Sequence, residues 1–395
     1  MHLPDGFSLT GLHSGIKQDA TREDISLIIS ETECTAAGVY TQNRVVAAPV
    51  LLDRERTPSD SIRGIVINSG NANACTGQQG RQNAEEMARL AAAVCQAKAE
   101  QILVLSTGII GEALPMKTIA DGIQRAADQL GKEEEHIVAA ARGMMTTDTT
   151  HKLASRTVNT QQGPIRILGM AKGAAMIGPN MATMLGVILT DAKMDAAVAQ
   201  QILHDSVQES FNCISVEGHM STNDTVLLLN SNRVGENNLT GSDLQQFTTA
   251  VRDTCIELAK AIPNDGEGAT HLIEVEVSGC RTREDAHQLA KTIADSALVK
   301  TAVAGADPNW GRIVSAAGYA GIDFEPADVE LRLNGILLYQ AGNPMPFDEE
   351  ETSALIRHHR DTHIDFRLQQ GEAAIRFWTC DLTAEYVHLN ADYHT

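Results

Sequence analysis

The chain has 395 residues, 43% of them hydrophobic, and this length exceeds one typical core, so we expect two domains or one large α/β unit. The 31 basic and 51 acidic side chains give a net charge of −20, which repels phosphate and argues against nucleic-acid or membrane partners. With seven scattered cysteines that form no Cys-x-x-Cys pair, no secretory signal and no apolar run of membrane-spanning length, the sequence predicts a reduced, cytoplasmic protein.

Apolar runs typical of buried strands alternate with helical patterns in the N-terminal part of the chain. Residues 65–67 and 102–105 are the clearest strands, and apolar residues recur at helical spacing over 87–94 between them. Each strand leads into a polar turn that contains glycine, at 68–71 and 106–108. Since loops at strand ends often carry the chemistry of α/β folds, we expect functional residues in these two turns.

The segment 169–186 is different, because it is rich in glycine and small residues and contains a proline. It is neither helix-periodic nor alternating until an apolar run over 184–189, which predicts a strand. A helix is predicted next, with Ala197, Ile202 and Val207 among its apolar positions.

A domain boundary is predicted near Cys280, dividing the chain into an α/β domain, 1–279, and a smaller α+β domain, 280–395. The second domain opens with a capping-box pattern at Thr282, followed by a helix whose apolar face extends to Ala297. The expected fold class is therefore α/β (α+β), a layered sandwich with a smaller C-terminal unit.

Two further patterns lie in the C-terminal part. Alternating residues over 329–333 meet Asn334-Gly335 and a second apolar run, which predicts a β-hairpin. His359 and His363 have the spacing of one helical face, but a zinc protease needs glutamate directly after the first histidine, and arginine stands there. We therefore expect a solvated, charged helix at the histidines and no metal site.

Thr183 supports a chemical hypothesis. A threonine that begins a buried strand is ordinarily only a good β-former. Here a segment with glycine and proline leads directly into it, which suits a strained peptide bond after Ala182. Attack of the Thr183 hydroxyl on the preceding carbonyl gives an N→O acyl shift, and hydrolysis then frees an α-amine that serves as a base near neutral pH.

Several long motifs, all in one order, carry a resemblance to a known family. They cover residues 68–74, 106–108, 145–149, 172–185, 221–225, 265–270, 305–312 and 390–395. Together they span the whole chain and are far more specific than a single glycine motif. The chain resembles the ornithine acetyltransferase family, the bifunctional arginine-biosynthesis proteins.

The resemblance implies a self-cleaving glutamate N-acetyltransferase of the cytoplasm that works by a ping-pong mechanism and needs no cofactor or metal. Thr183 takes the acetyl group of N2-acetylornithine, ornithine leaves, and glutamate collects the acetyl group. Some members also accept acetyl-CoA, as amino-acid acetyltransferases. The implied fold is of the self-processing aminopeptidase-like type. Fragments 1–182 and 183–395 are expected to stay associated, two of each, with the C-terminal tail completing the active site.

Motif by motif, the resemblance also assigns site residues. It places the oxyanion hole, which acyl transfer requires, on Thr107 and Gly108. Beside the nucleophile, it gives the substrate contacts as Thr146, Lys172, Thr183, Glu267, Asn390 and Thr395. Each has a structural alternative when read alone: a strand-ending turn, a helix cap with Thr147 as a rival, a solvated lysine, an exposed turn acid, or a frayed terminus.

Departures from the family pattern leave the donor preference and the acceptor range open. They occur at Glu217, His219 and His271, and at the alanines 174 and 175. Two other functions also remain open. A self-processing aminopeptidase or amidase would share the nucleophile and use water as acceptor, whereas an uncleaved binding protein would give one intact chain.

Overall fold

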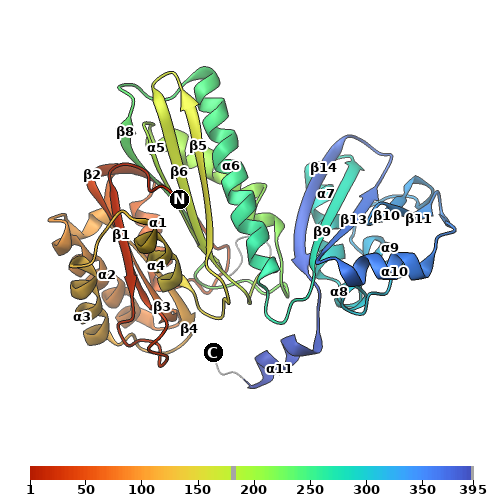
Figure 1. Cartoon of the computed structure of the whole chain (residues 1–395), viewed down its shortest axis with the longest axis horizontal. Coiled ribbons are helices and arrows are strands. Elements are labelled where there is room, and N and C mark those ends of the chain that lie inside the picture. The colour runs from red at the N-terminus through yellow and green to blue at the C-terminus, as the bar shows by residue number, and fades with distance from the viewer. Residues whose placement is uncertain (179–183, 393–395) are drawn as a thin grey trace.

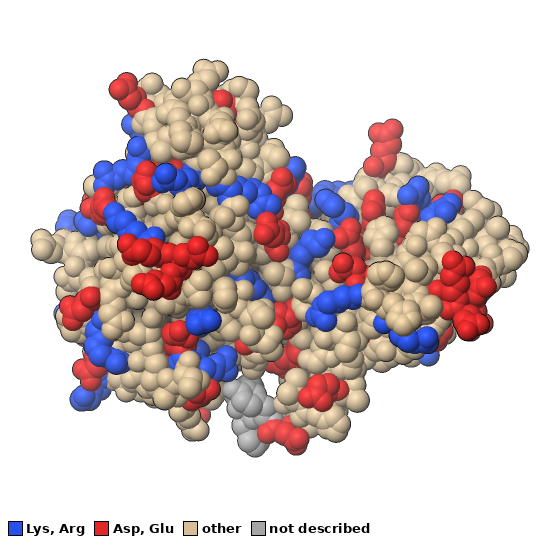
Figure 2. All heavy atoms as spheres, in the orientation of Figure 1, with Lys and Arg blue, Asp and Glu red and all other residues tan. Residues whose placement is uncertain are grey.

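The computed structural model describes residues 1–178 and 184–392, so Ala182, Thr183 and Thr395 lie outside the described residues. Two lobes, each built on its own β-sheet, lie side by side (Figure 1). Within the described residues, no helix is both long and apolar enough to cross a membrane. Basic and acidic side chains are interspersed on the face drawn in Figure 2.

The first lobe contains an eight-stranded sheet with the order β4-β3-β2-β8-β7-β6-β5 and with β1 paired to β2. Its strands are β1 (Phe7–Leu12), β2 (Ile25–Tyr40), β3 (Ser59–Asn71), β4 (Ile102–Ile109), β5 (Lys152–Thr160), β6 (Gly163–Lys172), β7 (Leu185–Ala192) and β8 (Thr225–Val234). The first half of β2 pairs with β1, and its second half pairs with β8. Register shifts against β3 fall between Ile29 and Ala36, so β2 links two halves of the sheet.

The two halves pack face to face, with Ile65 and Leu103 from one and Leu168 and Leu227 from the other in one buried cluster. The helices of this lobe are α1 (Ala48–Arg56), α2 (Gly77–Val94), α3 (Met116–Ala127), α4 (Glu134–Met144), α5 (Ala196–Gln208) and α6 (Gly241–Asn264). Helices α2, α3, α5 and α6 cover the outer faces, whereas α4 packs into the cluster between the two halves through Ile137 and Met144. A second cluster lies between β3, β4, α2 and α3, and a third lies beneath α5 and α6 and continues into the second lobe. The predicted layered α/β sandwich is confirmed.

The second lobe contains a six-stranded sheet with the order β12-β11-β10-β13-β9-β14. Its strands are β9 (Leu272–Cys280), β10 (Glu330–Leu333), β11 (Ile336–Gln340), β12 (Asn343–Pro344), β13 (Asp361–Arg367) and β14 (Ala373–Cys380). Its helices are α7 (Arg283–Asp295), α8 (Ala297–Ala304), α9 (Trp310–Gly318), α10 (Glu349–His358) and α11 (Ala384–Asp392). Among the described residues of both lobes, short 3-10 turns are η1 (Ala99–Gln101) before β4, η2 (Phe211–Cys213) before β8 and η3 (Pro326–Asp328) before β10.

Helix starts and turns were predicted correctly where a residue determines the conformation of the backbone next to it. The Thr282 hydroxyl accepts the Asp285 N–H at 3.1 Å and begins α7 as predicted. The predicted hairpin joins β10 to β11, and Asn334 and Gly335 have positive φ angles of 49° and 83°. The predicted strands at β3, β4 and β7 and the helices at α2 and α5 are also present.

Three details were wrong. The helix begun at Thr282 ends at Asp295, because Ser296 caps a separate helix that contains Ala297. The predicted glycine-rich irregular segment starts as strand, since β6 continues to Lys172. His359 and His363 do not share a helix: α10 ends before them, and His363 lies in β13. The domain division at 280 stays a prediction, and β9 pairs with β13 and β14.

Candidate active site

The two predicted glycine turns meet at one edge of the first sheet. Strands β3 and β4 are parallel, so their carboxyl ends lie together, with Gly70 opposite Gly108. Gly108 has a φ of 131°, and a Cβ atom there would lie 2.3 Å from the Gly70 carbonyl carbon. Only glycine fits this close backbone approach, which explains its place directly after Thr107.

Lys172 reaches Thr107 from the other half of the sheet. It ends β6 and is buried, and its Nζ donates a hydrogen bond to Thr107 Oγ1 at 3.3 Å. Burial lowers the pKa of the Lys172 ammonium, and the charge of Asp148 opposes that fall. The predicted solvated-lysine alternative is therefore wrong: the Lys172 side chain is buried beside the predicted oxyanion turn.

Asp148 binds the backbone on both sides of this cluster. One carboxylate oxygen accepts the Thr146 N–H at 2.9 Å, and the other accepts the Gly173 N–H at 2.6 Å. Burial alone would raise the pKa of Asp148, but the charges of Lys172 and Lys152 and the hydrogen bonds of Lys152 and Gly173 hold it well below its usual range. Asp148 is therefore an anion that places Thr146 next to the segment after Lys172.

Glu267 and Asn390 approach from the second half of the chain. The Glu267 N–H donates to the Ala174 carbonyl at 3.0 Å, which ties the glutamate to the segment after Lys172. The Asn390 amide, on α11, donates to Glu267 Oε2 at 2.8 Å. Both side chains are accessible to solvent, so the pair forms an open, anionic side of the site.

A buried carboxyl group lies close to the predicted cleavage point. Asp224 Oδ1 accepts the N–H of Met184, the residue after Thr183, at 3.0 Å. Burial raises the pKa of Asp224 well above its usual range. The adjacent Asn223 amide donates to the Ser106 carbonyl at 2.9 Å, so the loop before β8 connects the start of β7 to the end of β4.

The structure thus brings together Thr107, Gly108, Thr146, Lys172, Glu267 and Asn390. Asp148, Lys152 and Asp224 were not singled out from the sequence, although Asp148 and Asp224 lie inside the quoted motifs. The N-terminal loop was missed as well. Lys17 Nζ donates to the Met145 carbonyl at 2.8 Å and Arg22 donates to the Thr146 carbonyl, so both cations hold the Thr146 loop.

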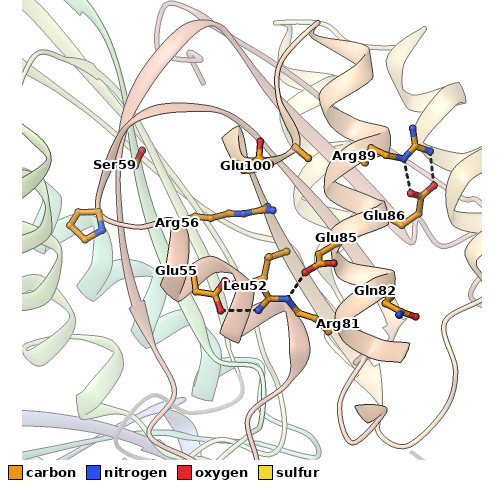
Figure 3. Close-up of a pocket in the computed structure, with 12 residues that line it drawn as sticks. Leu52, Glu55, Arg56, Ser59, Arg81, Gln82, Glu85, Glu86, Arg89 and Glu100 are labelled. Atoms are coloured by element: carbon orange, nitrogen blue, oxygen red, sulfur yellow. Dashed lines mark hydrogen bonds and ion pairs between the residues drawn. The ribbon is translucent and has the colours of Figure 1, made fainter. Parts of the chain in front are cut away.

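A cavity of about 820 Å³ lies elsewhere, between α1, α2 and the η1 turn. Arg81 is bonded to Glu55 and Glu85 there, and Arg89 is bonded to Glu86 (Figure 3). These cations are already neutralised by neighbouring carboxylates. We therefore assign the chemistry to the cluster around Lys172.

The departures from the family pattern have separate environments. His271 is buried in the second lobe, where Nδ1 lies 2.9 Å from Asp381 Oδ2, so it is a structural residue. His219 is exposed. Glu217 Oε1 accepts the Ile177 N–H at 2.7 Å and anchors the segment that leads toward Thr183.

Glu217 gives a pH-dependent stability prediction. Burial raises its pKa from 4.5 to about 7, so the folded protein favours the protonated form. The protonated side chain therefore contributes roughly 3 kcal/mol to the free energy of unfolding. This stabilisation is complete below pH 4.5 and is lost as the pH rises through 7. Glu217→Gln keeps an acceptor for Ile177 and should flatten that loss in urea unfolding at pH 5 and pH 8.5. Glu350→Gln changes an exposed glutamate and should keep the full loss of stability between the two pH values. The same loss in Glu217→Gln would refute the assignment of this pH dependence to Glu217.

The fold and the site define a layered α/β protein with a polar cluster at its strand ends, suited to a reaction that develops negative charge beside Thr107 and Lys172. Comparison with known protein families identifies the family to which this protein belongs. The sequence model of the ArgJ family matches residues 8–395, and the chain belongs to this family. The resemblance found from the sequence is confirmed.

Relatives cover the full length. The arginine biosynthesis bifunctional protein ArgJ of Rhodopirellula baltica is 43% identical over 396 residues, spanning 100% of this chain and 96% of the relative. That of Symbiobacterium thermophilum is 44% identical, spanning 99% and 98%. The crystal structure of the Bacillus halodurans arginine biosynthesis bifunctional protein argJ has a TM-score of 0.50 and 40% identity, covering 51% of this chain and 96% of that chain.

Proposed function

We propose that the chain is a self-cleaving acetyltransferase of arginine biosynthesis, which moves an acetyl group from N2-acetylornithine to glutamate through acetyl-Thr183. The names of its full-length relatives support the pathway. The observation that supports the chemistry is the contact of Lys172 with Thr107, beside the backbone of Gly108. This cluster provides hydrogen-bond donors and positive charge where acyl transfer forms an oxyanion.

The reaction has two halves. The free α-amine of Thr183 accepts the hydroxyl proton while the hydroxyl oxygen attacks the acetyl carbonyl carbon. Thr107 and Gly108 stabilise the tetrahedral oxyanion, which collapses as the ornithine nitrogen leaves with the proton. The glutamate amine then attacks the ester carbonyl carbon and gives one of its own protons to the Thr183 α-amine, which passes that proton to the Thr183 oxygen as the C–O bond breaks.

Charge determines how substrate lies in the site. Donor and acceptor both carry an α-carboxylate, which we assign to the Lys172 ammonium and the Thr146 hydroxyl. Ornithine also carries an ammonium group, and the Glu267–Asn390 pair offers it an anion with an amide beside it. Thr395 is proposed as a further contact from the family motif, and it lies outside the described residues.

We further propose that the enzyme is cytoplasmic, that acetyl-CoA is a second donor, and that two copies each of fragments 1–182 and 183–395 form the assembly. Contacts across the proposed cut support association of the fragments. One is the ion pair of Lys152 with Asp265 at 2.6 Å, and another is the hydrogen bond of Glu267 to Ala174.

The test is a single-turnover reaction with acetyl-labelled N2-acetylornithine. We expect label on a fragment that begins at Thr183, release of ornithine before glutamate is added, and transfer of the label to glutamate afterwards. A binding protein would give an intact, unlabelled chain. Acetylornithine hydrolysis that glutamate leaves unaffected would replace the transferase with the amidase.

A further inference from the structure

We propose that Lys152 is a positioning residue of this site: it joins Asp148 to Asp265 in a buried ion-pair chain that fixes Thr146, Lys172 and Glu267 relative to one another. Lys152 Nζ lies 2.8 Å from Asp148 Oδ1 and 2.6 Å from Asp265 Oδ2. The Lys152 and Asp148 side chains are at most 1% exposed and Asp265 is 8% exposed. The inference rests on the proposed function.

The two carboxylates at the ends of the ion-pair chain, Asp148 and Asp265, each hold a different part of the site. Asp148 accepts the N–H groups of Thr146 and of Gly173, the residue after Lys172. Asp265 accepts the Thr149 and Thr150 N–H groups at 3.1 and 3.3 Å, and it stands two residues before Glu267. Three segments distant in sequence therefore depend on one ammonium group.

Stability alone is a weak reason for such a chain. Removing three charges from water is costly, and a well-packed apolar cluster of similar volume often stabilises a fold equally well or better. The carboxylates here are also used to bind backbone N–H groups that carry proposed substrate residues. A rigid, fully hydrogen-bonded support of this kind holds reacting groups in one geometry.

The ion-pair chain of Asp148, Lys152 and Asp265 also affects the charge of Lys172. The titratable groups around Lys172 are Lys17 of the N-terminal loop, Asp148, Lys152 of β5, Asp224 before β8, and Glu267. Asp148 favours the Lys172 ammonium, and Lys152 disfavours it. Removal of Asp148 should therefore lower the pKa of Lys172, and removal of Lys152 should raise it. A purely structural role would not produce this pair of opposite shifts.

The test compares kcat and KM for N2-acetylornithine between pH 6 and pH 10 in the purified, cleaved protein. Asp148→Asn should move the alkaline limb of kcat/KM down by about one pH unit, and Lys152→Met should move it up. Displacement of the site should lower kcat/KM in both by roughly 100-fold, mainly through KM. Asp191→Asn removes another buried carboxylate that binds two N–H groups, in β7, and should change neither value.

Lys152→Arg keeps the charge and changes the geometry, so KM should rise while the alkaline limb stays in place. This variant carries the test if Lys152→Met does not fold. Wild-type KM in Lys152→Arg, or an unmoved limb in folded Asp148→Asn and Lys152→Met, would overturn the proposal. Failure of the wild-type protein to acetylate its 183–395 fragment would instead reject the proposed function.

Discussion

Replacing Thr183 by Ala is expected to give a single uncleaved chain and to reduce acetyl transfer by at least about 1,000-fold. The hydroxyl is the proposed nucleophile in both reactions, and the cut also creates the α-amine that serves as base, so one change removes both groups. The wild-type protein should yield fragments 1–182 and 183–395 on a denaturing gel. N-terminal sequencing of the second fragment should read Thr-Met-Leu-Gly.

Two controls make this result specific to the nucleophile. Thr183→Ser retains a hydroxyl and should still cleave and label, at a reduced rate. Thr190→Ala removes another threonine from the same part of the chain, a buried one in β7 whose Oγ1 donates to the Arg166 carbonyl at 2.8 Å. It should cleave fully. A stable, intact wild-type chain with full activity would contradict the mechanism.

The fold was predictable where the signal is local. Apolar runs identify β3 and β4 because both are buried, and Asn334-Gly335 identifies a hairpin because these residues tolerate positive φ. Long-range pairing was not predictable. The division of β2 between two halves of a sheet depends on register shifts against β3, and the pairing of β9 depends on strands far along the chain.

The site was predictable only through its motifs. Thr107 and Lys172 were assigned by resemblance, and their meeting follows from the packing of the two sheet halves. Lys152 was missed because its partner Asp265 is 113 residues away and no spacing rule connects them. Lys17 and Arg22 were missed because they donate to backbone carbonyls, which leave no pattern in the sequence.

Gly108→Ala is expected to damage the proposed oxyanion hole more than any change of similar size. The new Cβ would lie 2.3 Å from the Gly70 carbonyl carbon and 2.4 Å from the Asn71 nitrogen, both backbone atoms that cannot rotate away. Strain at a φ of 131° adds to the clash, for a total of roughly 3 kcal/mol or more. Relief requires the ends of β3 and β4 to separate, which moves the Gly108 N–H.

Loss of one oxyanion donor typically lowers kcat by about 100-fold or more. We therefore expect Gly108→Ala to show that loss in kcat with a smaller change in KM, and a lower midpoint in urea. Gly111→Ala is the matched control, since Gly111 has a φ of 87° but open space where its Cβ would lie. It should share the backbone strain and keep its kcat. Equal kcat in the two variants would show that the Gly108 N–H is not a donor of the oxyanion hole, and the Thr107 hydroxyl would then be its remaining candidate donor.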